Sequence, residues 1–319
     1  MAQHFLLSAK ARTLSLKQIY QSGEDAAYAM FCALRWPQSD GAPRCTRCNC
    51  EKVYHLTTRR KFKCAACHHQ FSVTSGTIFA SRKLSFVDLL AAICLFVNAA
   101  KGVSALQLAR DLDVQYKTAF VLAHKLREAL ARESATLKLG HAVEVDGAFF
   151  GGHVRPANLK ADRVDRRLLQ NRSQTRRVVV ALRERGGRTL TQVFRLESEG
   201  CAFARERIVE GSTVAADDLR HWDVLSSSFI MERIDHSEAY SRDGVHTNLA
   251  ESYFSRLRRM IRGQHHRVQA NHLGAYAAHA GWLEDHRRQS NGALAERLIR
   301  NALGTPVSRT WSGYWQRAV

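Results

Sequence analysis

Two Cys-x-x-Cys pairs constrain the fold of this chain more than any other feature of its sequence. The four cysteines are Cys45, Cys48, Cys64 and Cys67. Fifteen residues lie between the inner two, and four thiolates at this separation can complete a tetrahedral zinc site. The runs KVYHL and RKFKC alternate in polarity as short strands do, so residues 41–82 are predicted to form a zinc ribbon around a structural Zn²⁺. Cys50, His68 and His69 remain alternative ligands.

The composition indicates a folded protein with a polyanionic partner. Of the 319 residues, 45% are hydrophobic and only four are proline, which is typical of a folded chain and not of a disordered one. A net charge of +19 favours binding to a polyanion. Nucleic acid is the first candidate, and an anionic membrane surface is the rival.

The same sequence gives little support for a membrane or secreted protein. The longest apolar run, Leu89 to Val97, is too short to span a bilayer, and the first fifteen residues lack the hydrophobic core of a signal peptide. We therefore expect a cytoplasmic protein that associates with the nucleoid when bound to DNA, and no membrane partner. Eight cysteines in such a protein indicate metal binding before disulfides.

The segments on either side of the ribbon have helical periodicity. Residues 1–40 are predicted to be a helical lead-in that ends at Trp36-Pro37, and residues 83–135 are predicted to be entirely helical. In the second segment, helices over 104–112 and 116–130 are joined by a three-residue turn, as in a helix-turn-helix. The residues expected to face inward are Leu106, Ala109, Leu112, Val114 and Ala119. A plain helical bundle is the alternative.

If residues 83–135 form a helix-turn-helix, the start of its second helix would enter the major groove. Gln115 and Lys117 lie at that start, and both side chains can contact DNA.

From residue 140 onward the pattern changes to alternating strands, which predicts a mixed-sheet α/β domain over residues 140–290. The run HAVEVDGAFFGG, residues 141–152, reads as a strand that ends in a glycine turn. The remaining elements are expected as strands over 177–182 and 189–196, a helix over 201–210, a strand over 211–218, a helix over 219–225, a strand over 229–234 and a helix over 247–262. This order of elements is the one that a ribonuclease-H-like fold requires. Residues 291–319 are expected to form a C-terminal tail.

Three carboxylates on separate elements of this domain are the candidate catalytic residues. Asp146 lies inside an apolar strand, where an ionised carboxylate is costly unless a cation faces it. Asp217 ends a later strand, and Glu251 lies in the last helix on the same face as Asn248. Together the three acids could hold two Mg²⁺ ions, or Mn²⁺ in their place, for phosphoryl transfer. Asn248 could bind the metal, replace Glu251 or only orient it.

The last helix of this domain and the segment after it are strongly basic. No acidic residue occurs between Ser252 and Leu283. The arginines expected to contact phosphate are Arg256, Arg258, Arg259 and Arg262. A solvated helix face is the alternative interpretation.

Several of these segments resemble the DDE-type bacterial insertion-sequence transposases, specifically the ISXO-like subfamily with an N-terminal zinc ribbon. The matching runs are ALRWPQSDGAPRCTRC, LARDLDVQYKTAF, EVDGAFFGG, TVAADD and HTNLAESYFSRLRRMIRGQHH, together with the second cysteine pair. The chain departs from the subfamily at Tyr253-Phe254, where other members have Trp, and in its first cysteine knuckle, which lacks the usual Pro and Gly.

The resemblance implies an activity and a set of partners. It implies cleavage of DNA at terminal inverted repeats followed by strand transfer into target DNA, with Asp146 and Asp217 as metal ligands. The third ligand position in the family accommodates either residue type offered here, Asn248 or Glu251. Such transposases act as multimers on paired ends, so a homo-oligomer is expected. Two alternatives remain: a DNA-binding protein derived from a transposase whose catalytic site is idle, and a ribonuclease-H-like nuclease without strand transfer.

Overall fold

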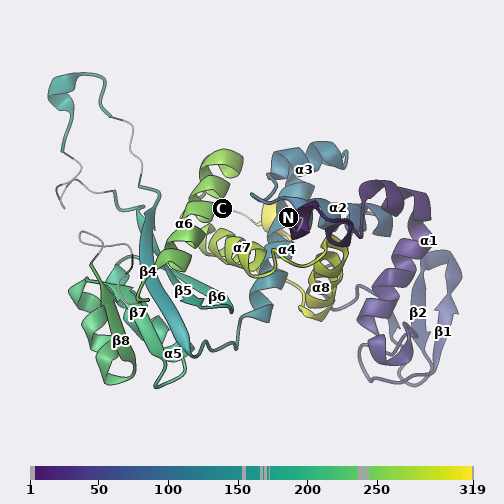
Figure 1. Cartoon of the computed structure of the whole chain (residues 1–319). Coiled ribbons are helices and arrows are strands. Elements are labelled where there is room, and N and C mark those ends of the chain that lie inside the picture. The colour runs from purple at the N-terminus through teal and green to yellow at the C-terminus, as the bar shows by residue number, and fades with distance from the viewer. Residues whose placement is uncertain are drawn as a thin grey trace. The chain divides into compact units, whose positions relative to one another are not determined.

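The computed structural model describes residues 4–317 except 153–155, 166–167, 169–170, 172, 236–240 and 242–243. The chain forms two compact units. The first unit combines Met1–Glu133 with His286–Val319, and the second is Ser134–Asp285. Figure 1 shows their helices and strands, and each unit is described separately below.

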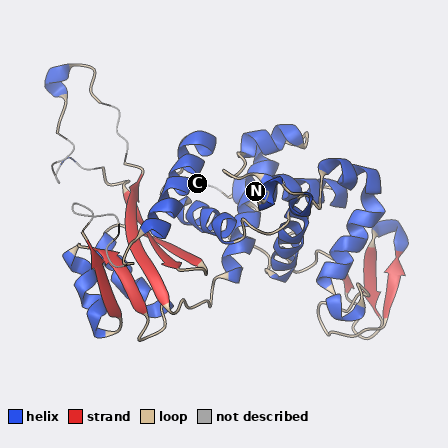
Figure 2. Cartoon of the chain, viewed as in Figure 1, coloured by secondary structure: helices blue, strands red, loops and turns tan. Residues whose placement is uncertain are grey.

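The first unit contains a long helix, α1, followed by a small antiparallel sheet. Helix α1 covers Leu16–Arg35 and is kinked at Gly23, whose φ of 77° falls in a region that glycine adopts readily. The helix ends at Trp36, as the sequence predicts. Strands β1 (Val53–Leu56), β2 (Lys61–Cys64) and β3 (Gln70–Phe71) form the predicted ribbon (Figure 2), and the ring of Trp36 packs on those of Phe62 and Phe71.

A group of helices completes the first unit. Helix α2 (Phe86–Asn98) is apolar on nearly all sides and buried. Helices α3 (Ala105–Asp111) and α4 (Tyr116–Glu133) pack together across the predicted turn, and the Ser104 hydroxyl caps α3 through the backbone N–H of Gln107. Helix α8 (Asn291–Gly304) lies within the predicted C-terminal tail and packs on α1, α2 and α4.

The structure corrects one predicted core residue in α3. Leu106 was expected to face inward but is 50% exposed, whereas Leu108 is fully buried. Positions i and i+2 of a helix lie about 200° apart around its axis, so Leu106 and Leu108 cannot both enter the same interface. In a helix of seven residues, Leu108 and Ala109 form the buried side.

The second unit is built around a five-stranded mixed sheet in the order β6-β5-β4-β7-β8. Strands β4 (Ala142–Phe150), β5 (Arg177–Glu184) and β6 (Thr189–Phe194) form an antiparallel meander. Strands β7 (Thr213–Asp217) and β8 (Ile230–Ile234) run parallel to β4. This topology confirms the predicted ribonuclease-H-like sheet.

Helices cover both faces of this sheet. Helices α6 (Asn248–Met260) and α7 (Leu273–Asp285) pack on one face, and α5 (Gly200–Arg207) packs with the other (Figure 1). The predicted helix over 219–225 is instead a 3₁₀ helix, η8, at Arg220–Ser227. A π-helical turn, η9 (Ile261–His265), follows α6 directly.

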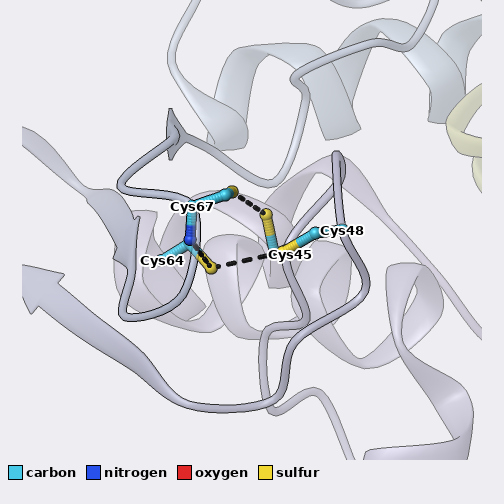
Figure 3. A group of neighbouring side chains, drawn as sticks. All are labelled: Cys45, Cys48, Cys64 and Cys67. Carbon is cyan, nitrogen blue, oxygen red and sulfur yellow. Dashed lines mark hydrogen bonds between the residues drawn. The ribbon is translucent and has the colours of Figure 1, made fainter.

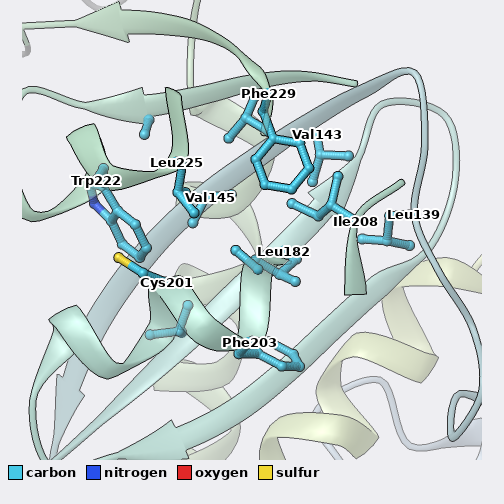
Figure 4. Packing of buried hydrophobic residues seen from close by; sticks show 14 of the residues in the cluster. Leu139, Val143, Val145, Leu182, Cys201, Phe203, Ile208, Trp222, Leu225 and Phe229 are labelled. Atoms are coloured by element: carbon cyan, nitrogen blue, oxygen red, sulfur yellow. The ribbon is translucent and has the colours of Figure 1, made fainter. Parts of the chain in front are cut away.

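Strand alternation divides the side chains of β4 between two cores. Val143 and Val145 enter the core beneath α5 and η8, together with Leu182, Phe203 and Trp222 (Figure 4). Ala148 and Phe150 enter the core beneath α6 and α7. Because successive residues of a strand face opposite sides, Glu144 and Asp146 share the α6 face of the sheet with Ala148.

Across the described parts of both units, none of the helices has the length and apolar character needed to cross a lipid bilayer.

Candidate active site and metal centres

The pairing of β4 with β7 brings two of the predicted carboxylates to neighbouring positions. Val145 pairs with Ala216 in parallel register, and both side chains enter the core beneath α5. Asp146 and Asp217 each follow one residue later, so they lie on adjacent strands and face the side of the sheet that carries α6. Beyond β7, the Arg233 guanidinium donates to the Asp217 carbonyl oxygen at 2.6 Å and holds the end of that strand.

The environment of Asp146 opposes its ionisation. Burial raises the pKa of Asp146 to about 7; the Gly147 backbone N–H, which donates to Oδ1 at 2.7 Å, partly offsets this effect. The negative charges of Asp217, Glu197 and Glu251 raise the pKa further, so all three lie close enough to act on Asp146. Within the described ranges, neither Lys nor Arg forms an ion pair with Asp146. A largely buried acid among other acids suits a divalent cation.

The third predicted position lies at the start of α6. Asn248 is the first residue of the helix and Glu251 lies in its first turn, and both are exposed. The carboxylates do not form a tight group: among the described residues, the one set of three or more His, Cys, Asp or Glu ligand atoms that all lie within 4.8 Å of one another is made of cysteines.

Two further acids near this site escaped the sequence analysis. Glu197 lies in the 3₁₀ helix η7 (Glu197–Glu199), and its carboxylate occupies the space where a side chain at Gly147 would begin. Burial and the charge of Asp217 raise the pKa of Glu197. Only the glycine beside Asp146 signalled this close approach in the sequence.

Glu144 is the other missed acid, and it lies in the same apolar run as Asp146. Its carboxylate is fully buried and accepts hydrogen bonds from the backbone N–H groups of Leu249 and Ala250 in α6. The reasoning that singled out Asp146, an acid within an apolar strand, applies equally to Glu144.

The four predicted zinc ligands lie together in the ribbon. The sulfur atoms of Cys45 and Cys67 are 3.6 Å apart and those of Cys48 and Cys64 are 3.5 Å apart (Figure 3). Sulfurs around a tetrahedral zinc ion, with Zn–S bonds of about 2.3 Å, are separated by roughly 3.8 Å. The arrangement therefore fits a structural zinc ion.

Local backbone geometry supports this zinc site. The Cys67 backbone N–H donates to the Cys64 sulfur at 3.5 Å and lowers the pKa of that thiol to about 6, which favours the thiolate that zinc requires. The Cys50 thiol instead lies 3.7 Å from the Lys52 carbonyl oxygen and is not one of the four clustered sulfurs.

The predicted DNA-contacting arginines of α6 and η9 differ in their surroundings. Arg258, Arg259 and Arg262 are exposed, and the Arg258 guanidinium also lies near the rings of Phe150 and Phe254. The Nε atom of Arg256 lies 2.7 Å from Glu284 in α7, so this guanidinium has a partner within the fold.

In the first unit, the predicted DNA-reading residues lie beside the C-terminal segment. Gln115 and Lys117 are exposed at the start of α4, and the Lys117 ammonium lies 5.4 Å from the centre of the Trp315 ring. Phe120 of α4 contacts the rings of Trp311, Tyr314 and Trp315.

Comparison with known protein families gives matches to both units. Residues 138–285 match the family described as ISXO2-like transposase domain. Residues 22–70 match the family described as transposase zinc-ribbon domain. A comparison with curated proteins produced no match.

Proposed function

Because this chain belongs to the DDE-type insertion-sequence transposases with an N-terminal zinc ribbon, we propose that it binds terminal inverted repeats, cleaves DNA there and transfers the strand to target DNA. The catalytic part of the proposal rests on the environment of Asp146, a largely buried acid whose neighbouring charged groups include three other carboxylates. Such a group is stable as a carboxylate only when a cation joins it.

Asp146, Asp217 and Glu251 would hold Mg²⁺ or Mn²⁺, with Asn248 as the other candidate for the third position. A bound pair of divalent ions would supply activation of water or a 3′-hydroxyl and stabilisation of the leaving oxygen. The contacts to DNA would come from side chains of the protein. The exposed Arg258, Arg259 and Arg262 would neutralise the phosphates of DNA lying along α6.

The first unit would recognise the DNA ends. In this proposal, residues 83–135 form the helix-turn-helix, with Gln115 and Lys117 directed into the major groove. The ribbon, residues 41–82, would be stabilised by one Zn²⁺ held by its four clustered cysteines. Residues 140–290 would form the catalytic domain, and two or more copies would act together on paired ends.

The alternative, a DNA-binding protein with an idle site, is less consistent with these neighbouring acids. Carboxylates that repel one another and bind no metal destabilise the fold, so their loss would be tolerated once catalysis had ceased.

Cleavage by an Asp146→Asn variant tests the proposal. The substrate is a duplex that carries the ends of the element encoding the chain, with Mg²⁺ in the buffer. We expect cleavage to be abolished and DNA binding to be nearly unchanged, while Glu206→Gln, which neutralises an exposed acid on α5, cleaves like the wild type. Cleavage by Asp146→Asn at the wild-type rate would refute the catalytic assignment, and loss of binding would show that the role of Asp146 is wrong.

A further inference from the structure

We propose that Glu144 is a positioning residue that fixes the start of α6, and with it the third metal-ligand position, relative to Asp146. The inference rests on the proposed function, because it concerns the geometry of that metal site. It assigns a task to an acid that touches neither DNA nor metal in the proposed mechanism.

Glu144 caps helix α6 from a distant part of the chain. Its Oε2 accepts hydrogen bonds from the backbone N–H of Leu249 at 2.8 Å and of Ala250 at 3.1 Å. These are the second and third residues of α6, whose amides an N-cap side chain ordinarily satisfies. A carboxylate at this end of a helix is also favoured by the helix dipole.

The second oxygen of Glu144 lies beside two basic side chains. The Arg185 Nε donates to Oε1 at 3.2 Å, and the His246 Nδ1 lies 2.9 Å from the same oxygen. A further guanidinium nitrogen of Arg185 donates to the His246 carbonyl at 3.1 Å. Both carboxylate oxygens are therefore engaged, which allows the group to be fully buried.

The origin of this cap on β4 has a consequence for the active site. Glu144 and Asp146 lie two residues apart on the same face of one strand, a separation of about 7 Å. An N-cap residue from the adjoining loop would stabilise α6 but leave it free to shift over the sheet. A cap from β4 instead ties the helix to the strand that carries Asp146. Asn248 and Glu251 lie within the first turn of the helix that is tied in this way.

Metal affinity and helix protection together test this role. The full-length, zinc-loaded protein is titrated with Mn²⁺ at pH 8, and bound metal is measured by electron paramagnetic resonance. For Glu144→Gln we expect the Kd for Mn²⁺ to rise 10–100-fold, as is typical when a residue that orients metal ligands is changed. Hydrogen exchange of residues 247–260 should become faster in the same variant.

The matched control is Glu184→Gln. Glu184 lies on the neighbouring strand β5 and also accepts backbone N–H groups, from Gly140 at 2.9 Å and Arg188 at 3.4 Å, but contacts no residue of α6 through these bonds. Its substitution should leave Mn²⁺ affinity and the exchange of α6 unchanged.

Arg185→Gln keeps the inference testable if Glu144→Gln does not fold. This variant retains the carboxylate and removes one of its partners, so we expect a smaller rise in Kd. Where Glu144→Gln folds, the double variant should lose less affinity than the two single losses combined, because both residues act through one carboxylate.

Wild-type Mn²⁺ affinity in a folded Glu144→Gln variant would overturn the positioning role, even if the hydrogen exchange of α6 became faster. If Glu144→Gln does not fold, wild-type Mn²⁺ affinity in Arg185→Gln would overturn it. Asp146→Asn distinguishes this failure from that of the proposed function. If Asp146→Asn loses Mn²⁺ and Glu144→Gln does not, only the positioning role is wrong. If Asp146→Asn also binds Mn²⁺ like the wild type, the metal site itself is misplaced and both proposals fail.

Discussion

The raised pKa of Asp146 leads to an unusual expectation: removing its charge should stabilise the protein when Mg²⁺ is absent. Asp146→Asn keeps the shape of the side chain and an oxygen that can accept the Gly147 N–H, but it cannot ionise. The wild-type carboxyl has a pKa of about 7 in the folded protein against an ordinary value of 3.8. Its favourable contribution to stability is therefore complete below about pH 4 and is lost as the pH rises to 7.

The magnitude follows from this difference in pKa. Each pH unit between the two values corresponds to about 1.4 kcal/mol, so ionised Asp146 destabilises the metal-free protein by about 4 kcal/mol above pH 7. For a unit of this size, 1 kcal/mol changes Tm by roughly 2–4 °C, so the variant should melt several degrees higher at pH 8, with an upper limit of roughly 16 °C. At pH 5 the expected advantage is only about 1.5 kcal/mol.

Thermal unfolding of the zinc-loaded protein, followed by circular dichroism from pH 5 to 8.5 with and without Mg²⁺, measures this effect. Mg²⁺ should raise the Tm of the wild type and leave that of Asp146→Asn unchanged, because binding to the folded state alone stabilises it. Asp218→Asn is the matched control, since it removes an exposed carboxylate one residue beyond Asp217. A variant that melts below the wild type at pH 8 without Mg²⁺, or a difference that does not grow with pH, would refute the reasoning.

Three other predictions concern the zinc ribbon, the C-terminal segment and the basic helix. Cys64→Ser should release zinc and unfold residues 45–67, as measured by a colorimetric zinc assay, whereas Cys50→Ser should retain the metal; retention by both would contradict the ligand assignment. Trp311→Ala should lower the free energy of unfolding by about 3–5 kcal/mol in denaturant titrations, because the indole is 7% exposed and stacks on a histidine of α4; a loss below about 1 kcal/mol would contradict this packing. Arg259→Gln should weaken DNA binding and reduce the slope of log K against log salt by about 0.9. Arg256→Gln, which breaks the pair with Glu284, should mainly lower the stability of the fold. Equal slopes in the wild type and Arg259→Gln would exclude a phosphate contact.

Much of the fold follows from local patterns in the sequence. Alternation predicts the strands around Asp146 and the ribbon between its cysteine pairs, because successive side chains of a strand face opposite sides of the sheet. The spacing of four cysteines identifies the ligands that the structure brings together. Leu106 was misplaced because helical spacing alone does not tell which of two apolar residues in a short helix reaches the interface.

The parts that could not be predicted depend on residues far apart in the sequence. Glu197 follows β6, and only the folded sheet brings it to Gly147 on β4. Likewise, the cap on α6 comes from Glu144, more than a hundred residues earlier, so no capping pattern near Asn248 could indicate it. Helix–strand contacts of this kind are determined by tertiary packing and leave no periodic signal.

The surroundings of the two acids of β4 explain why Glu144 is assigned a structural role and Asp146 a catalytic one. Glu144 and Asp146 share a strand, a face and an apolar sequence context, so the cost of removing each from water is similar in kind. Glu144 recovers that cost through hydrogen bonds from two backbone amides and Arg185, and His246 lies beside the same carboxylate. Asp146 accepts one hydrogen bond, from the backbone N–H of Gly147, and faces further carboxylates. Buried polar groups in stable folds are normally satisfied, and the exceptions occur mainly at functional sites. Asp146 is therefore the acid expected to meet a cation, and Glu144 is the acid expected to fix the helix that carries the third ligand position.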